Sequence, residues 1–282
     1  MISEYYWLTK PGIIYGNAIT AIGGFFLAVN SKVDFNLFFC MLFGLAFVIA
    51  SACVFNNYID RDIDLMMART KNRAMAKQTI PAFNALLFGG ILGVIGFFLL
   101  WFGTNPLALL LAFVGFVVYV FMYTFLKRRT THATLVGSIS GAVPIVVGYC
   151  AVTGKFDIVA VLLFAIMTVW QMPHFYSIAI YRQDDYEKAK IPVLPIVKGA
   201  FVTKIQILCY IIAYMMLVIL LALFDNVGDI YLALMVTLVG YWLWLGTQGL
   251  DDGSNQQWAK KMFRFSLIVL LAFSMMISIH AV

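Results

Sequence analysis

Three polar residues at a regular spacing could bind a metal ion. Asn56, Asp60 and Asp64 follow an apolar stretch that ends near residue 55, and each lies four residues after the last. If the helix continues through them, the three side chains share one face, where the like charges repel each other. A hard divalent cation such as Mg²⁺ reverses that repulsion, because it accepts carboxylate and amide oxygens as ligands. A solvated helix end fits the same residues, so the spacing leaves both interpretations open.

Basic residues occur close to this triplet and at the end of another apolar stretch. Arg69, Lys71 and Arg73 follow the triplet, and Lys127 and Arg128 end the apolar stretch near residue 126. Arginine binds phosphate oxygens with two parallel hydrogen bonds, and lysine supplies a point charge. Lysine and arginine also anchor the cytoplasmic ends of membrane helices. The basic groups therefore indicate either a diphosphate site or membrane topology.

A second group of candidate residues lies between positions 170 and 188. His174 follows a proline inside an apolar stretch, and the adjacent acids Asp184 and Asp185 come about three turns later. Ionisable residues within a membrane span are costly and usually face a cavity, so His174 is a candidate for a functional role. Acids at the ends of apolar helices, flanked by bases, indicate a polar mouth above an apolar interior. A diphosphate with a long hydrocarbon tail matches such a site.

Transmembrane helices must position these residues. The chain has 282 residues, 63% hydrophobic and 11% charged, whereas soluble domains have about half and a quarter. Spanning the hydrocarbon core takes roughly 20 residues of helix, and lipid leaves no partner for unpaired backbone groups. The expected fold class is all-α, a polytopic protein in a lipid bilayer. Its nine expected spans are 12–29, 37–55, 84–102, 106–126, 134–153, 157–181, 203–224, 230–248 and 263–281.

The basic residues give these spans an orientation. Alternating the spans from a cytoplasmic N-terminus places all 19 Lys and Arg on the cytoplasmic side except Lys32 and Lys155. Such a bias sets the orientation of membrane proteins, so we expect a cytoplasmic N-terminus and a C-terminus on the outer face. The same bias accounts for the net charge of +6 without a nucleic-acid partner.

Four runs of the sequence carry a resemblance to a known family. They are LTKPGIIYGN (8–17), NNYIDRDIDLMMARTKNR (56–73), VGSISGAVPIVVGYCAVTG (136–154) and WQMPHFYSIAIYRQDDYEKAKIPVLPIVKG (170–199). Over essentially its whole length the chain resembles the intramembrane prenyltransferase superfamily that includes 4-hydroxybenzoate polyprenyltransferase. Within it, the chain is most similar to the branch that farnesylates protohaem IX.

This resemblance implies an architecture and a reaction. Residues 1–282 would form one prenyltransferase domain, with nine helices around a central cavity that opens near the cytoplasmic face. The loops at about 56–83 and 182–202 would carry the active site. Mg²⁺ would bridge the acids to farnesyl diphosphate, and haem B would accept the farnesyl group with addition of water to give haem O. The resemblance further implies the bacterial cytoplasmic (inner) membrane, and oxidase-assembly proteins as partners.

It also implies roles for individual residues. The metal ligands would be Asn56, Asp60, Asp64, Asp184 and Asp185, all catalytic except Asp184. The diphosphate would contact Arg69, Lys71, Arg73, Lys127 and Arg128, and the haem would contact His174. The second acidic motif of the superfamily has two acids four residues apart, whereas here the two acids are adjacent. Of the two, we expect Asp185 to be the catalytic metal ligand.

Two other functions fit parts of the pattern. A prenyltransferase that acts on the aromatic ring of a quinone precursor would share the acidic and basic motifs, but it does not account for the WQMPHF run at 170–175. A membrane haem transporter or carrier would line a translocation path with its acids. Transporters often contain internal repeats, and this sequence has none that we find.

Overall fold

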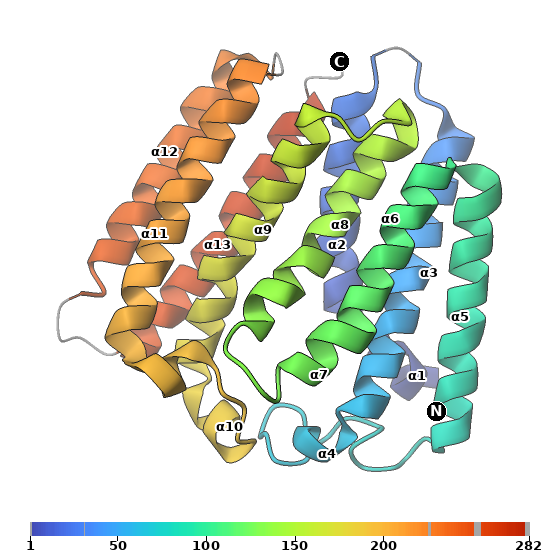
Figure 1. The fold of residues 1–282 in the computed structure, drawn as a ribbon, viewed down its shortest axis with the longest axis vertical. Coiled ribbons are helices and arrows are strands. Elements are labelled where there is room, and N and C mark those ends of the chain that lie inside the picture. The colour runs from blue at the N-terminus through green and yellow to red at the C-terminus, as the bar shows by residue number, and fades with distance from the viewer. Residues whose placement is uncertain (1, 31, 225–226, 251–254, 280–282) are drawn as a thin grey trace.

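The computed structural model describes residues 2–30, 32–224, 227–250 and 255–279. Within these ranges nine helices are long and apolar enough to cross a membrane, as expected, and there is no strand (Figure 1). The nine spans are α2 (Pro11–Ala28), α3 (Phe35–Ile59), α5 (Ala82–Gly103), α6 with its continuation (Pro106–Leu126), α8 (Ala133–Thr153), α9 (Ile158–Tyr181), α11 (Leu194–Phe224), α12 (Gly228–Thr247) and α13 (Asn255–Ile279).

The short helices gather at one end of the bundle, which we call the polar end. They are α1 (Ile2–Leu8), α4 (Arg61–Asp64), α7 (Thr124–Leu126) and α10 (Gln183–Lys188), and all lie at the bottom of Figure 1. A π-helical turn, Val118–Tyr123, joins α6 (Pro106–Val117) to α7. Such turns are rare and often occur at functional sites. The polar end therefore combines the charged loops with an irregular helix end.

Three spans that begin at the opposite end are started by side-chain caps. Asp34, Asn105 and Asp157 each accept a hydrogen bond from the backbone N–H three residues later, at 3.0, 2.9 and 3.1 Å. These are N-cap hydrogen bonds, which satisfy amides that have no partner within the helix. Short polar loops can therefore turn the chain there without leaving backbone groups unpaired.

Three helices extend beyond the expected spans at the polar end. The α3 helix continues to Ile59, α11 begins at Leu194 and α13 begins at Asn255. Non-helical backbone at Gly199, with φ of 83°, interrupts α11. Hydropathy marks only the part of a helix that matches the hydrocarbon thickness, so the polar extensions of α3 and α13 lie beyond the expected spans. The first residues of α11 are largely apolar, but the break at Gly199 separates them from the span. The expected end of the last span at 281 lies outside the described residues.

The helices around α2 pack closely. The α2 helix contacts α3, α8 and α13, and α8 also contacts α6 and α9. At the crossing of α2 and α8, Gly24 faces the carbonyl oxygen of Ile145, and Gly148 faces that of Ala21. A Cβ at either glycine would lie 2.0 Å from the facing oxygen. Small residues permit this approach, which is a common basis of helix association in membranes.

We expect Gly148→Ala to destabilise the protein by about 1–3 kcal/mol, because the new methyl group must push α2 away from α8. Thermal unfolding in detergent measures the effect. The matched control is Gly90→Ala on α5, where a Cβ meets nothing within 4 Å. Equal melting temperatures for the two variants would contradict the packing assigned to this crossing.

Candidate active site

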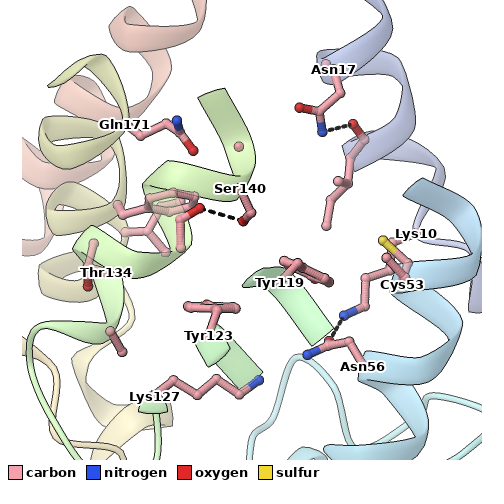
Figure 2. A pocket seen from close by; sticks show the side chains of 18 of the residues that line it. Lys10, Asn17, Cys53, Asn56, Tyr119, Tyr123, Lys127, Thr134, Ser140 and Gln171 are labelled. Carbon is pink, nitrogen blue, oxygen red and sulfur yellow. Dashed lines mark hydrogen bonds between the residues drawn. The ribbon is translucent and has the colours of Figure 1, made fainter. Parts of the chain in front are cut away.

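A cavity of about 500 Å³ extends from the polar end into the bundle. In Figure 2, Lys127 and Asn56 lie at its lower edge and Gln171 at its upper edge, with Tyr119 and Tyr123 between them. Four bases and two acids border it: Lys10, Arg69, Arg73, Lys127, Asp60 and Asp64. The expected central cavity is thus present, and the charges along its wall leave an excess of two positive charges that suits an anion.

The acidic triplet forms one buried stripe at the end of α3. Asp60 ends α3, yet its N–H still bonds the carbonyl of Asn56, and the N–H of Asp64 bonds the carbonyl of Asp60, both at 2.9 Å. The helical spacing therefore persists through the triplet, as the sequence predicted. Each of the three residues is only 2% exposed, which excludes a solvated helix end.

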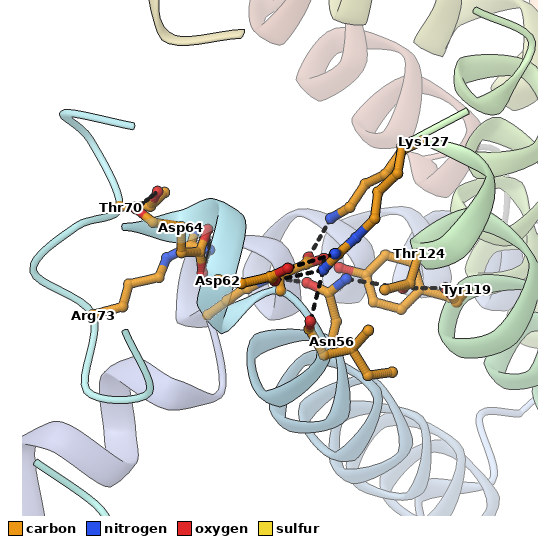
Figure 3. Close-up of polar contacts among 12 residues, drawn as sticks. Asn56, Asp62, Asp64, Thr70, Arg73, Tyr119, Thr124 and Lys127 are labelled. Atoms are coloured by element: carbon orange, nitrogen blue, oxygen red, sulfur yellow. Dashed lines mark hydrogen bonds and ion pairs between the residues drawn. The ribbon is translucent and has the colours of Figure 1, made fainter. Parts of the chain in front are cut away.

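Each buried acid is paired with a base (Figure 3). Lys127 donates a hydrogen bond to Oδ2 of Asp60. Arg73 donates to both oxygens of Asp64, at 3.0 and 2.9 Å. A buried carboxylate without a partner costs several kcal/mol. The structure thus joins two of the predicted metal-binding acids to two of the predicted diphosphate-binding bases.

Lys10 is a site residue that the sequence interpretation assigned only to topology. It precedes α2 with left-handed φ and ψ of 54° and 65°, and its Nζ donates to Oδ1 of Asn56. The amide of Asn56 in turn donates to the hydroxyl of Thr124 at 2.9 Å. Burial lowers the pKa of Lys10 to about 8. The signal available in the sequence was a lone base directly before the Pro-Gly pair that starts α2.

The other predicted diphosphate contacts lie in different positions. Arg69 borders the cavity, whereas Lys71 is exposed. Arg128 does not border it: its guanidinium donates two hydrogen bonds of 2.7 Å to Asp62, although one nitrogen also lies 3.6 Å from Asp60. Hydrogen bonding within this pair lowers the pKa of Asp62 and raises that of Arg128. Adjacent bases at the end of α7 therefore serve different acids.

The second acidic group connects two loops. Asp184 is exposed. Oδ1 of Asp185 accepts a hydrogen bond of 3.0 Å from the backbone N–H of Ala68, and Oδ2 lies 3.9 Å from Arg182. Neither acid is among the residues that border the cavity. Apolar side chains pack beside this contact, namely Ile63, Met67, Ala189 and Ile191. Asp185 thus holds the loop after α4 against α10.

The oxygen donors at the mouth suit Mg²⁺ in chemistry. Within the described ranges, no three His, Cys, Asp or Glu side chains form a ready-made metal cluster. Asn56, Asp60 and Asp64 nevertheless border the cavity, and they are hard oxygen donors. Oδ1 of Asp60 is buried and accepts no hydrogen bond from the described residues. A buried acceptor in this state is costly, and a cation in the cavity would remove that cost.

His174 borders the interior of the cavity. Its Nδ1 lies 2.7 Å from the hydroxyl of Ser266 on α13, and its ring stacks on Trp170 with centroids 4.8 Å apart. Both contacts fix the plane of the imidazole. The interior is otherwise largely apolar. This agrees with the apolar interior below a polar mouth that the sequence indicated.

We expect Asp185→Ala to loosen the loop between residues 65 and 81, because the N–H of Ala68 loses its acceptor. Hydrogen exchange at Ala68 should become faster, and trypsin should cut after Arg69 and Lys71 more rapidly. The matched control is Asp184→Ala, which removes an exposed neighbouring acid. Unchanged exchange and cleavage in Asp185→Ala would contradict the role of this contact.

Solved structures share the fold. A structure of digeranylgeranylglyceryl phosphate synthase superimposes with a TM-score of 0.82 at 20% identity, over 99% of this chain and 98% of the other. A UbiA homologue from Archaeoglobus fulgidus bound to GPP and Mg²⁺ superimposes with a TM-score of 0.73 at 13% identity, over 98% and 99%. At these identities the likeness shows the fold.

Sequence relatives cover nearly the whole chain. It is 48% identical over 280 residues to a protein named protoheme IX farnesyltransferase from Yersinia enterocolitica, and 49% identical to proteins of the same name from Shigella flexneri and Escherichia coli. In each case the alignment covers 99% of this chain and 95% of the relative. Residues 17–268 match the UbiA prenyltransferase family. The chain belongs to the UbiA prenyltransferase family.

Proposed function

We propose that this protein transfers the farnesyl group of farnesyl diphosphate to a vinyl group of haem B, with addition of water, to give haem O and diphosphate. The names of the relatives support this acceptor. The observation that carries the proposal is the set of buried oxygen donors and bases at the mouth of an apolar cavity. The product would serve the assembly of haem-copper oxidases, with oxidase-assembly proteins as partners.

The charged mouth would bind the diphosphate. Mg²⁺ held by Asn56, Asp60 and Asp64 would stabilise the negative charge of the leaving diphosphate. Lys127 and Arg73, which now pair with those acids, would exchange them for phosphate oxygens. The second acidic group, Asp184 and Asp185, would form a further metal site. Preorganised bases beside a leaving group act by electrostatic stabilisation.

Four further bases would contribute to the diphosphate site in different ways. Arg69 and Lys10 border the cavity and would bind phosphate oxygens directly. Arg128 would act through its contact with Asp60. Lys71 is exposed, so it would contact the diphosphate only if part of the diphosphate extends out of the cavity mouth.

The interior would hold the farnesyl chain away from water. Tyr119 and Tyr123 border the cavity, with ring centroids 5.6 Å apart, and Phe116 and Trp170 also border it. Departure of diphosphate leaves an allylic cation, which the faces of aromatic rings attract. The electron-rich vinyl group of the haem would then attack this cation.

His174 would bind the haem iron. The hydroxyl of Ser266 donates its only hydrogen to the carbonyl of Phe263 at 2.6 Å. The same hydroxyl must therefore accept a hydrogen bond from Nδ1–H of His174. The lone pair of Nε2 is then available for a metal, and a fixed tautomer of this kind is usual for histidine ligands.

We also propose that the polar end faces the cytoplasm of a bacterial inner membrane. The loops and helix ends that carry most of the Lys and Arg residues lie at that end, which agrees with the rule that cytoplasmic loops carry the excess of positive charge. The N-terminus would lie in the cytoplasm and the C-terminus on the outer face.

The direct test is conversion of haem B to haem O by detergent-solubilised protein with farnesyl diphosphate and Mg²⁺. We expect Asp60→Ala and Asp64→Ala to lower kcat/KM by about 100-fold or more, as for loss of a group that stabilises the transition state. Asp62→Ala is the matched control, because Asp62 lies between them in the sequence but is exposed. Its activity should stay within severalfold of the unchanged protein.

Each alternative gives a different result in this assay. Full activity of Asp64→Ala, or activity that persists in excess chelator, would contradict the metal-binding role. Prenylation of a quinone precursor in place of haem B would favour the other acceptor. Haem binding without any farnesylated product would favour a haem carrier.

The pKa of Lys10 predicts how diphosphate binding depends on pH. Its protonated form binds an anion, so the affinity for a non-hydrolysable farnesyl diphosphate analogue should fall as pH rises above about 8, by up to tenfold per pH unit. Lys10→Arg keeps its charge and should move this loss to higher pH. Isothermal titration between pH 7 and 10 measures both. Parallel curves for the two proteins would show that another group titrates.

A further inference from the structure

Gln171 is a buried polar residue that neither the diphosphate site nor the haem ligand uses. It lies on α9, one turn before His174, is 4% exposed and borders the cavity. Its amide donates both hydrogens to backbone carbonyls, of Ser138 on α8 and of Met167 on α9, each at 2.9 Å. Its Oε1 accepts no hydrogen bond from the residues that the structure describes. The amide therefore presents a fixed acceptor.

The neighbouring backbone holds this acceptor in one place. Oε1 rests against Gly141 on α8, where a Cβ would lie 2.0 Å from it. An amide whose two donors are both engaged cannot rotate without breaking both bonds, and its oxygen keeps two lone pairs. A water molecule in the cavity would satisfy it, and buried waters commonly do this for protein groups.

Water at this position would have a chemical use. The proposed reaction leaves a cation on the carbon next to the pyrrole ring after the vinyl group attacks the farnesyl carbon. That cation either forms a bond to the oxygen of water, which then loses a proton, or loses a proton from the adjacent carbon to give an alkene. In both cases the proton can pass to the departing diphosphate, which is a base. The position of a water therefore decides between alcohol and alkene.

The place of Gln171 on α9 favours a role in this step. Gln171 and the proposed iron ligand His174 lie three residues apart on α9, and both border the cavity. The charged residues that border the cavity come from other elements, namely the start of α2, the end of α3 with α4, the loop that follows it, and the end of α7. An amide oxygen orients water without adding a charge that would trap the cation.

We propose that Gln171 holds the water that adds to the farnesylated vinyl group, and so makes the product an alcohol instead of an alkene. This inference rests on the proposed function. Gln171 is a positioning residue that acts through water, and its hydrogen bonds to Ser138 and Met167 keep its oxygen directed to that water.

The test compares the farnesylated haems that each variant makes from haem B and farnesyl diphosphate, resolved by mass spectrometry. In Gln171→Met, which has a similar length but no oxygen, the ratio of alkene to alcohol should rise about tenfold, the effect of one ordinary hydrogen bond. This ratio does not depend on how much of the enzyme folds. Ser140→Ala removes another hydroxyl that borders the cavity and should leave the ratio unchanged.

A second variant separates the role of the oxygen from a general disturbance of the cavity. Met167→Leu reshapes the cavity wall one turn before Gln171 without removing an oxygen, and it should leave the ratio unchanged. A ratio in Gln171→Met equal to that of the unchanged protein would overturn the proposal, as would an equal rise of the ratio in Met167→Leu. If the unchanged protein makes neither product, the proposed function fails instead.

Discussion

The structure depends on the pairing of buried acids with partly buried bases where α3 ends. Asp60 and Asp64 are each 2% exposed, and a charge that far from water must be compensated locally. Lys127 comes from the end of α7 and Arg73 from the loop that follows α4, so the pairs connect three separate parts of the chain. Charge compensation therefore fixes the shape of the cavity mouth.

These pairs also explain how one site can bind two ligands of opposite charge. The acids suit a divalent cation and the bases suit a diphosphate, and each acid also pairs with a base, Asp60 with Lys127 and Asp64 with Arg73. Binding of metal and diphosphate together would exchange one set of opposite-charge contacts for another, which keeps the cost of desolvation small. The hydrogen bond from Ala68 to Asp185 holds together two segments that border this mouth, since Met67 and Tyr186 both border the cavity.

The sequence predicted the features that follow from local periodicity. Nine apolar stretches gave the spans, and the spacing of Asn56, Asp60 and Asp64 gave the buried stripe. Contacts between distant segments could not be predicted this way. Lys10 reaches Asn56 only because left-handed backbone precedes α2 and because α2 packs on α3. Asp185 accepts a hydrogen bond from a backbone amide 117 residues away. Every residue except proline has such an amide, so the residue types in the sequence cannot predict this partner.

Metal and diphosphate should replace the acid–base pairs at the mouth when both bind. A crystal structure with a non-hydrolysable farnesyl diphosphate analogue and Mn²⁺ in place of Mg²⁺ tests it most directly, because anomalous scattering locates the metal. Manganese should be bound by Asp60 and Asp64, with Lys127 and Arg73 on phosphate oxygens. Acids still paired with these bases, and a diphosphate bound elsewhere, would contradict it.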